Sequence, residues 1–155
     1  MAHPFPRPCA CKQIMTPRSL LLSPTHSAAI AACARTRFPR ECCGLLEGIA
    51  HDDGWRLTAV HESRNIAEQP EQHFLIDPQM HIHLLRRLRG TERTVIGCFH
   101  SHPRGRAEPS STDLLSAAEQ DFLWLIAAGE GEEFDLRAYL FSAANFQSVP
   151  IIQDR

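Results

Sequence analysis

The chain has 155 residues, of which 43% are hydrophobic and 22% are charged, and its formal net charge is −2. This length and composition fit one globular domain with its own hydrophobic core. The near-neutral charge argues against a nucleic-acid partner or an anionic membrane surface, and no apolar run approaches the length of a membrane span.

Residues 1–17 contain four prolines and show no periodicity. They predict a disordered extension ahead of one folded domain over residues 18–155. Three leucines before Ser23 are too few for the apolar region of a signal peptide, so we expect a cytoplasmic protein with reduced cysteines. Cys9 and Cys11 lack the second pair of ligands that a zinc ribbon requires, so they are not interpreted as a metal site.

Helical and strand patterns alternate along the rest of the chain. Ser23-Pro24 and Asp77-Pro78 each place a capping side chain before a proline, which favours the start of a helix. The expected elements, in chain order, are a helix over 24–36, strands over 43–50 and 55–62, a polar loop over 63–72, a helix over 78–88, a strand over 94–99, a helix over 112–120, and strands over 122–128, 136–142 and 147–152. This interleaving predicts an α/β fold in which a mixed β-sheet is sandwiched by helices.

Three details of these elements are also predicted. Vicinal Cys42-Cys43 is interpreted as one buried and one half-buried strand residue. Arg86, Arg87 and Arg89 are interpreted as a solvated helix face. The same helix is expected to bury an apolar stripe of four residues, namely Met80, Leu84, Leu85 and Leu88.

His100 and His102 form a His-Ser-His motif at the end of a predicted strand. A strand alternates its faces and rises about 3.3 Å per residue, so both rings point to the same side and can converge on one ion. Asp113 follows a loop at the start of a predicted helix, where the helix dipole favours an ionised carboxylate. Two histidines and one carboxylate leave a fourth position for water, which is typical of a catalytic zinc site.

His81 and His83 have the same spacing, but they lie in a predicted helix. Two residues rotate by about 200° around a helix, so these two rings diverge. We expect both to be surface or half-buried residues. The spacing of His100 and His102 is therefore informative only because a strand carries it.

Each part of the motif also has an ordinary structural interpretation. A lone His-x-His on a strand is more often incidental, and Glu41 could be a strand-entry glutamate. Ser110 and Asp113 ahead of an apolar run match a helix capping box. The conjunction of these features, rather than any single one, points to a functional site.

Glu41, His100-Ser101-His102, a seven-residue spacer and Ser110-x-x-Asp113 together resemble the signature of the JAMM (MPN+) metalloproteases. Segments 39–46, 65–67 and 74–78 resemble the prokaryotic stand-alone members, so the similarity covers nearly the whole chain. The resemblance implies a cytidine-deaminase-like MPN fold and one catalytic Zn²⁺ bound by His100, His102 and Asp113. It also implies that Glu41 is the general base, that Ser110 stabilises the oxyanion, and that Ser101 orients its neighbours.

The resemblance further implies zinc-dependent hydrolysis of peptide or isopeptide bonds at the C-terminal tail of a ubiquitin-like protein. A short loop over 63–72, and no long insertion after Asp113, favour a small sulfur-carrier-like partner over ubiquitin itself. We expect this loop and residues 103–109 to form the walls of a channel for the tail. The sequence leaves open whether the chain forms a homodimer.

Other functions remain as alternatives. A non-catalytic MPN-type scaffold is disfavoured by the intact ligands and base. A DNA-repair-associated relative is expected to bring an upstream helical segment, for which residues 1–17 are too short. A zinc deaminase needs His-x-Glu and Pro-Cys-x-x-Cys, and neither pattern occurs in the chain. Cys98, on the same predicted strand face as His100, is the only substitute ligand that the sequence offers.

Overall fold

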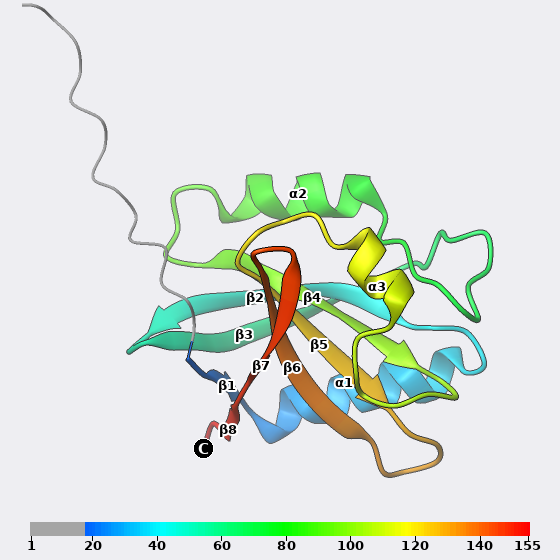
Figure 1. Cartoon of the computed structure of the whole chain (residues 1–155). Coiled ribbons are helices and arrows are strands. Elements are labelled where there is room, and N and C mark those ends of the chain that lie inside the picture. The colour runs from blue at the N-terminus through cyan, green and yellow to red at the C-terminus, as the bar shows by residue number, and fades with distance from the viewer. Residues whose placement is uncertain (1–17) are drawn as a thin grey trace, which may run out of the picture.

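The structure is a computed structural model, and it describes residues 18–155. The predicted disordered extension, with Cys9 and Cys11, lies outside the described residues. Within residues 18–155, eight strands form one mixed sheet in the order β7-β6-β5-β4-β2-β3-β1-β8 (Figure 1). The elements are β1 Leu20–Leu22, α1 Pro24–Arg37, β2 Cys43–His51, β3 Gly54–Ser63, α2 Pro78–Leu88, β4 Thr94–His102, α3 Ser111–Ser116, β5 Phe122–Ala128, β6 Asp135–Ser142, β7 Asn145–Val149 and β8 Ile151–Gln153.

Both predicted helix starts are confirmed. Ser23 caps α1 by accepting a hydrogen bond from the backbone N–H of His26 at 3.2 Å. Asp77 caps α2 by accepting one from the backbone N–H of Gln79 at 3.0 Å. Each cap satisfies a backbone donor that has no partner within the first helical turn. Gly90 follows α2 with a φ of +79°, a conformation that glycine adopts at little cost, and the chain then enters β4.

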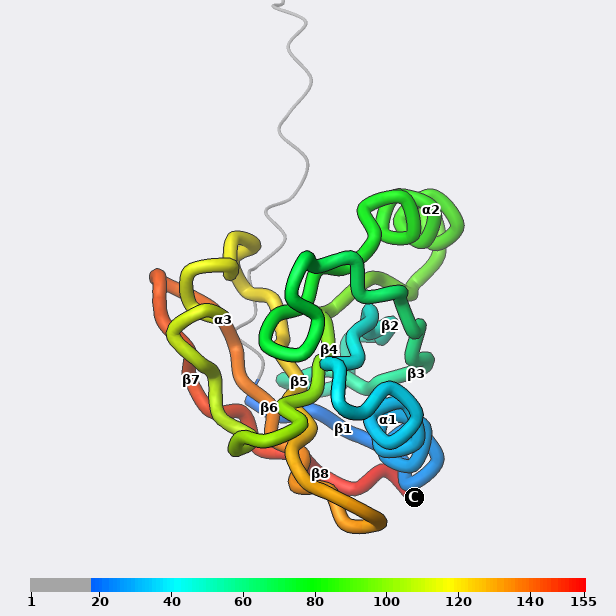
Figure 2. Tube along the Cα trace, turned by 90° about the vertical axis from the view of Figure 1, so that its right-hand side faces the viewer, coloured from blue at the N-terminus to red at the C-terminus, as the bar shows by residue number. Residues whose placement is uncertain are grey.

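The sheet separates two apolar layers, as predicted for an α/β sandwich. On one face, Ile30, Cys33 and Ala34 of α1 belong to the largest cluster of buried side chains. On the other face, Leu84 and Leu88 of α2 belong to a second cluster with side chains of β2, β4 and β5. Figure 2 shows the two helices on opposite sides of the strands. In the described part of the chain, no helix combines the length and the apolar character that crossing a membrane requires.

Two burial predictions are wrong in detail. Leu85 is 49% exposed, whereas Leu84 and Leu88 are buried. Consecutive helical residues are rotated by about 100°, so Leu85 points away from the face that Leu84 buries. Cys42 and Cys43 are both buried rather than one of them half-buried. Neighbouring strand residues point to opposite faces, and here a helix covers each face.

The last two strands lie at opposite ends of the sheet. β7 pairs with β6, while β8 pairs with β1 at the other end of the strand order. Only Pro150 separates β7 from β8, and its carbonyl accepts a hydrogen bond from the N–H of Leu20 at 2.9 Å. The single predicted strand over 147–152 is therefore two strands, because proline has no N–H to continue the ladder. The three residues of β1 were not predicted as a strand, because so short a segment shows no alternation.

The third helix is shorter than predicted. It ends at Ser116 instead of continuing to residue 120, and Ala117 is already extended with a ψ of 123°. Leu115 is 88% exposed, so a longer α3 would have no apolar face to bury along the sheet. Residues 117–121 instead carry the chain back to β5, which runs parallel to β4.

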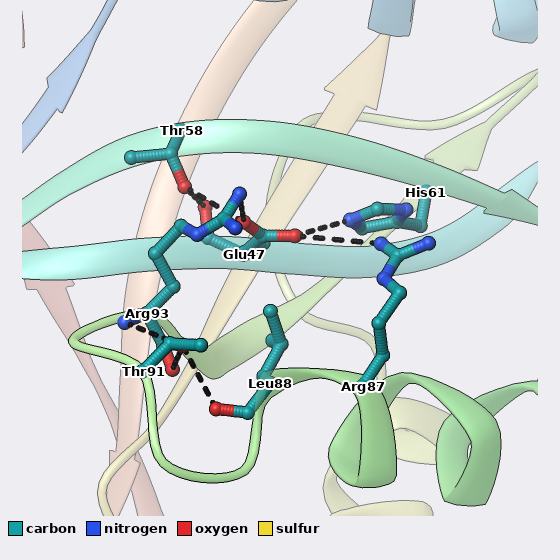
Figure 3. A network of polar contacts seen from close by, with 7 residues as sticks. All are labelled: Glu47, Thr58, His61, Arg87, Leu88, Thr91 and Arg93. Atoms are coloured by element: carbon teal, nitrogen blue, oxygen red, sulfur yellow. Dashed lines mark hydrogen bonds and ion pairs between the residues drawn. The ribbon is translucent and has the colours of Figure 1, made fainter.

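A buried carboxylate of the sheet forms an ion pair with a residue near the end of α2. Glu47 of β2 is 1% exposed, with Oε2 at 2.8 Å from Nε2 of His61 and Oε1 at 3.0 Å from Nη1 of Arg93. Arg87 of α2 approaches the same carboxylate at 3.7 Å (Figure 3). Arg87 is thus not only part of a solvated face, because its guanidinium turns toward β2 while half of its side chain stays exposed.

Candidate metal centre and active site

Pairing between β2 and β4 brings the two distant parts of the predicted motif together. The strands are antiparallel, and Cys43 lies opposite His100. Continuing this register by two residues places Glu41 opposite His102. The predicted base and a predicted ligand therefore face each other, although they are far apart in the sequence.

Ser101 joins the segments that carry the ligands and the base. Its backbone N–H donates to the carbonyl of Cys42 at 3.1 Å, and its hydroxyl oxygen accepts from the N–H of Cys42 at 2.8 Å. Both bonds are made to the backbone of Cys42, which directly follows Glu41 in the chain. Ser101 thus links β4 to the residue that follows Glu41.

The side chains of His100, His102 and Asp113 present donor atoms to one another. The two Nε2 atoms are 2.9 Å apart, and Oδ2 of Asp113 lies 3.3 Å from Nε2 of His100 and 3.1 Å from Nε2 of His102. Donors around a tetrahedral zinc, with bonds of about 2.0–2.1 Å, are roughly 3.3 Å apart. The structure thus brings the three predicted ligands together, and their spacing fits a zinc ion.

A backbone carbonyl orients the ring of His102. Its Nδ1 lies 2.7 Å from the carbonyl oxygen of Arg106. A carbonyl can only accept, so Nδ1 carries the proton and Nε2 turns a lone pair toward the ligand group. Metal-binding histidines commonly have such a partner on the second nitrogen. The sequence motif gives no sign of this partner, because Arg106 contributes its backbone rather than its side chain.

His100 is fully buried between aromatic rings. Phe74 stacks on it with centroids 4.2 Å apart, and Trp124 meets its edge at 5.6 Å. Burial lowers the pKa of His100, which favours the neutral form that binds metals. Burial tends to raise the pKa of Asp113, but its close contacts with His100 and His102 outweigh this effect and hold that pKa well below its usual range. Asp113 is therefore an ionised carboxylate.

Glu41 lies beside the ligand group in a buried position, with 6% of its surface exposed. Burial raises the pKa of Glu41 to about 7, because it penalises the charged form. Its Oε2 is buried and has no hydrogen-bond partner among residues 18–155. A carboxylate with a free oxygen and a pKa near neutrality has the properties of a general base.

The loop after β3 holds the backbone of Glu41. The N–H of Glu41 donates to the carbonyl of Pro70 at 2.7 Å, and its carbonyl accepts from the side-chain amide of Asn65 at 3.1 Å. The same amide lies 2.8 Å from the carbonyl of His73, and its oxygen accepts from two further backbone N–H groups of the loop. No role was predicted for Asn65 from the sequence, although asparagine commonly holds backbone turns in this way.

A groove of about 340 Å³ reaches the ligand group at His102. Residues 71–73 and 103–105 line it, and Glu41, His102, Ser110 and Thr112 also contribute. Residues 71–72 and 103–105 belong to the two loops that we expected to form the walls of a channel, whereas residue 73 lies just beyond the first of them. Both walls reach the residues that the sequence assigned to catalysis.

Ser110 belongs to this groove and also caps α3. Its Oγ accepts a hydrogen bond from the N–H of Asp113 at 3.0 Å, and Oδ2 of Asp113 accepts from the N–H of Ser110 at 2.8 Å. The capping box that the sequence allowed is therefore confirmed. Because neither bond uses the hydroxyl proton of Ser110, that proton is still available to a substrate oxygen. The box also fixes the orientation of Oδ2.

Other candidate ligands stay outside this group. His81 is half-buried and His83 is exposed on α2, as predicted. Cys98 is fully buried behind His100 on β4, and burial raises the pKa of its thiol well above the usual value. Cys98 is not among the described side chains that converge as a possible metal-binding group, so it is not part of this arrangement.

Comparison with known proteins identifies the family. A model described as prokaryotic homologs of the JAB domain matches residues 23–142. The chain belongs to this family. The resemblance to JAMM (MPN+) proteins that the sequence suggested is thus confirmed, together with the α/β fold.

Individual relatives agree with this assignment. Desampylase of Haloferax volcanii is 31% identical over 113 residues, which cover 73% of this chain and 78% of that protein. CysO-cysteine peptidase of Mycobacterium tuberculosis is 28% identical over 112 residues, covering 72% and 75%. The solution structure of a protein from Desulfitobacterium hafniense has a TM-score of 0.79 and 27% identity, covering 88% of this chain and 93% of that chain.

Proposed function

We propose that this JAB-family chain is a zinc-dependent hydrolase that cuts the peptide or isopeptide bond after the C-terminal tail of a small ubiquitin-fold or sulfur-carrier protein. The convergence of His100, His102 and Asp113 beside the buried Glu41 carries this proposal. The relatives named desampylase and CysO-cysteine peptidase support a hydrolase of this kind. A pure scaffold would not need a buried carboxylate with a free oxygen next to three convergent ligands.

The roles of the residues follow from their positions. His100, His102 and Asp113 would hold a zinc ion, which would supply Lewis-acid chemistry for activating water and the scissile carbonyl. Glu41 accepts the proton of the attacking water and later delivers it to the leaving amine. The hydroxyl of Ser110 donates to the carbonyl oxygen as negative charge develops there. The carbonyl of Arg106 keeps His102 in the tautomer that these steps require.

The groove selects an extended tail that ends in glycine. Its two walls are loops, and Gly105 in one of them lies so close to His102 that a Cβ at position 105 would be 3.3 Å from Cβ of that histidine. A side chain at position 105 would therefore crowd His102. Glycine has no Cβ, so a Gly-Gly end lets the substrate backbone approach the ligands most closely.

The test uses the zinc-loaded chain and fusions of a ubiquitin-fold carrier protein to a short peptide. One fusion carries Gly-Gly before the cut and a matched fusion carries Ala-Ala, and each is also incubated with a chelator. We expect cleavage of the Gly-Gly fusion alone, and its loss with the chelator, both followed by mass spectrometry. Equal cleavage of both fusions, or of an unrelated unfolded protein, would identify a general peptidase instead.

A further inference from the structure

A second pocket meets the groove at Glu41. It has a volume of about 210 Å³, and three of its lining residues are Arg37, Arg40 and Arg64. We call it the arginine pocket. Among the described residues, Glu41 is the only one that lines both this pocket and the groove over the metal ligands. The predicted base therefore borders two spaces, and of these only the groove is also lined by a predicted ligand, His102.

Two of the three guanidinium groups in the arginine pocket are already paired. Nε of Arg37 lies 2.8 Å from Oε1 of Glu62, and Nη2 of Arg64 lies 3.7 Å from a carboxylate oxygen of Asp77. Arg40 is exposed and forms no ion pair with any residue in the range 18–155. It is thus the cation of this pocket that is free to bind an anion.

The position of the leaving group follows from the role of Glu41, so this step rests on the proposed hydrolase function. Glu41 must reach the scissile nitrogen in order to protonate it as the C–N bond breaks. The acyl half of the substrate, with its carbonyl near His102 and Ser110, occupies the groove. The atoms attached to the nitrogen then extend past Glu41, and the space on that side is the arginine pocket.

We propose that the arginine pocket holds the leaving group and that Arg40 binds its α-carboxylate. Water adds its oxygen to the carbonyl carbon, the C–N bond breaks, and Glu41 passes the water's proton to the nitrogen, which leaves as a free amino acid. An arginine presents a planar fork of donors that matches a carboxylate. The chain therefore acts as an exopeptidase on the carrier tail.

The size of the pocket supports a small leaving group. The pocket's volume of about 210 Å³ is below the roughly 300–1,000 Å³ of typical small-molecule sites. Cysteine, with seven non-hydrogen atoms, is an amino acid of this size. A folded protein attached through a lysine side chain would bring an aliphatic stem and no carboxylate to Arg40. The pocket thus favours a peptide bond to one terminal residue over an isopeptide bond between proteins.

The experiment compares two substrates that differ in one group. A ubiquitin-fold carrier ending in Gly-Gly is extended by one cysteine, either with a free carboxylate or as the C-terminal amide. For the zinc-loaded parent chain we expect kcat/KM to be about ten- to a hundredfold higher for the free acid, mainly through KM, because Arg40 does not touch the reacting atoms. In Arg40→Ala the two substrates should be cleaved within about threefold of each other, and Arg40→Lys should keep part of the preference.

Arg104→Ala is the matched control, because Arg104 lines the groove on the other side of Glu41. It should keep the acid-to-amide ratio of the parent chain. Equal cleavage of acid and amide by the parent would overturn the assignment of Arg40 while leaving the hydrolase function intact. Loss of the preference in Arg104→Ala, but not in Arg40→Ala, would place the carboxylate in the groove and also overturn it. Cleavage of neither substrate by the zinc-loaded chain would instead refute the proposed function itself.

Discussion

Replacing Glu41 with glutamine should abolish hydrolysis and, in the metal-free protein, increase the free energy of unfolding at neutral pH. Glu41 is 6% exposed, and its Oε2 has no hydrogen-bond partner among residues 18–155. Burial raises the pKa of Glu41 from 4.5 to about 7. The ionised carboxylate therefore costs folding free energy, and glutamine has nearly the same shape without the charge.

The size of the effect follows from the two pKa values. Because the folded-state pKa lies above the unfolded one, the stability contributed by the protonated carboxyl is complete below about pH 4.5 and is lost as the pH rises through about 7. Linkage gives a loss of about 1 kcal/mol at pH 5 and about 3 kcal/mol at pH 8. The advantage of Glu41→Gln over the parent should therefore be about 2 kcal/mol larger at pH 8 than at pH 5.

The assay is urea unfolding of both metal-free proteins at pH 5 and pH 8, followed by tryptophan fluorescence. The same variant, loaded with zinc, should show no cleavage of the Gly-Gly fusion. Glu71→Gln is the matched control, because Glu71 lines the same groove but is exposed. It should change the free energy of unfolding by no more than about 0.5 kcal/mol at either pH. A pH-independent difference between Glu41→Gln and the parent would refute the reasoning from burial.

Three further predictions concern the ligands, the oxyanion and the buried carboxylate of β2. His102→Ala and Asp113→Ala should each lose stoichiometric zinc in elemental analysis of the metal-loaded proteins, and tight zinc in both would remove them as ligands. Ser110→Ala should keep its zinc but lower the turnover of the Gly-Gly fusion by about 10²–10³-fold, because one donor to the oxyanion is lost; an unchanged rate would leave Ser110 as a helix cap only. Glu47→Ala should lower the free energy of unfolding by about 2–4 kcal/mol, because charge-assisted hydrogen bonds to a buried carboxylate are lost. The side chain of Arg87 is 54% exposed and pairs with Glu47 at 3.7 Å, so Arg87→Ala should lower the free energy of unfolding by no more than about 1 kcal/mol in the same urea assay. Equal losses of stability in Glu47→Ala and Arg87→Ala would contradict this ranking.

The ligands could be predicted from the sequence because their arrangement is local. His100 and His102 share one face of a single strand, and Asp113 follows after a short loop, so strand geometry alone brings them close. Glu41 lies 59 residues before His100, and no local pattern connects the two. Its assignment came from the family resemblance, and the register of β2 against β4 now gives the physical reason.

Contacts that use backbone atoms or loop side chains could not be predicted. The carbonyl of Arg106 orients His102 whatever side chain residue 106 carries. Phe74 stacks on His100 only because the loop after β3 folds back over β4. Glu47 did leave a signal, since a glutamate within an apolar strand between two helix-covered faces needs partners for its charge. Those partners come from three other segments, so the sequence alone does not predict which residues they are.

The site combines two units that are held by different parts of the fold. His102 and its neighbouring ligands belong to β4 and α3, and their positions depend on the sheet and the capping box. Glu41 depends on the loop after β3, where Asn65 uses both the donors and the oxygen of its amide on backbone groups. Residues 71–73 of that loop also line the groove. Residues 71–73 and the proposed base therefore form a single hydrogen-bonded unit, so under the proposed function a tail that contacts these residues would be aligned against Glu41 and not only against the proposed ligands.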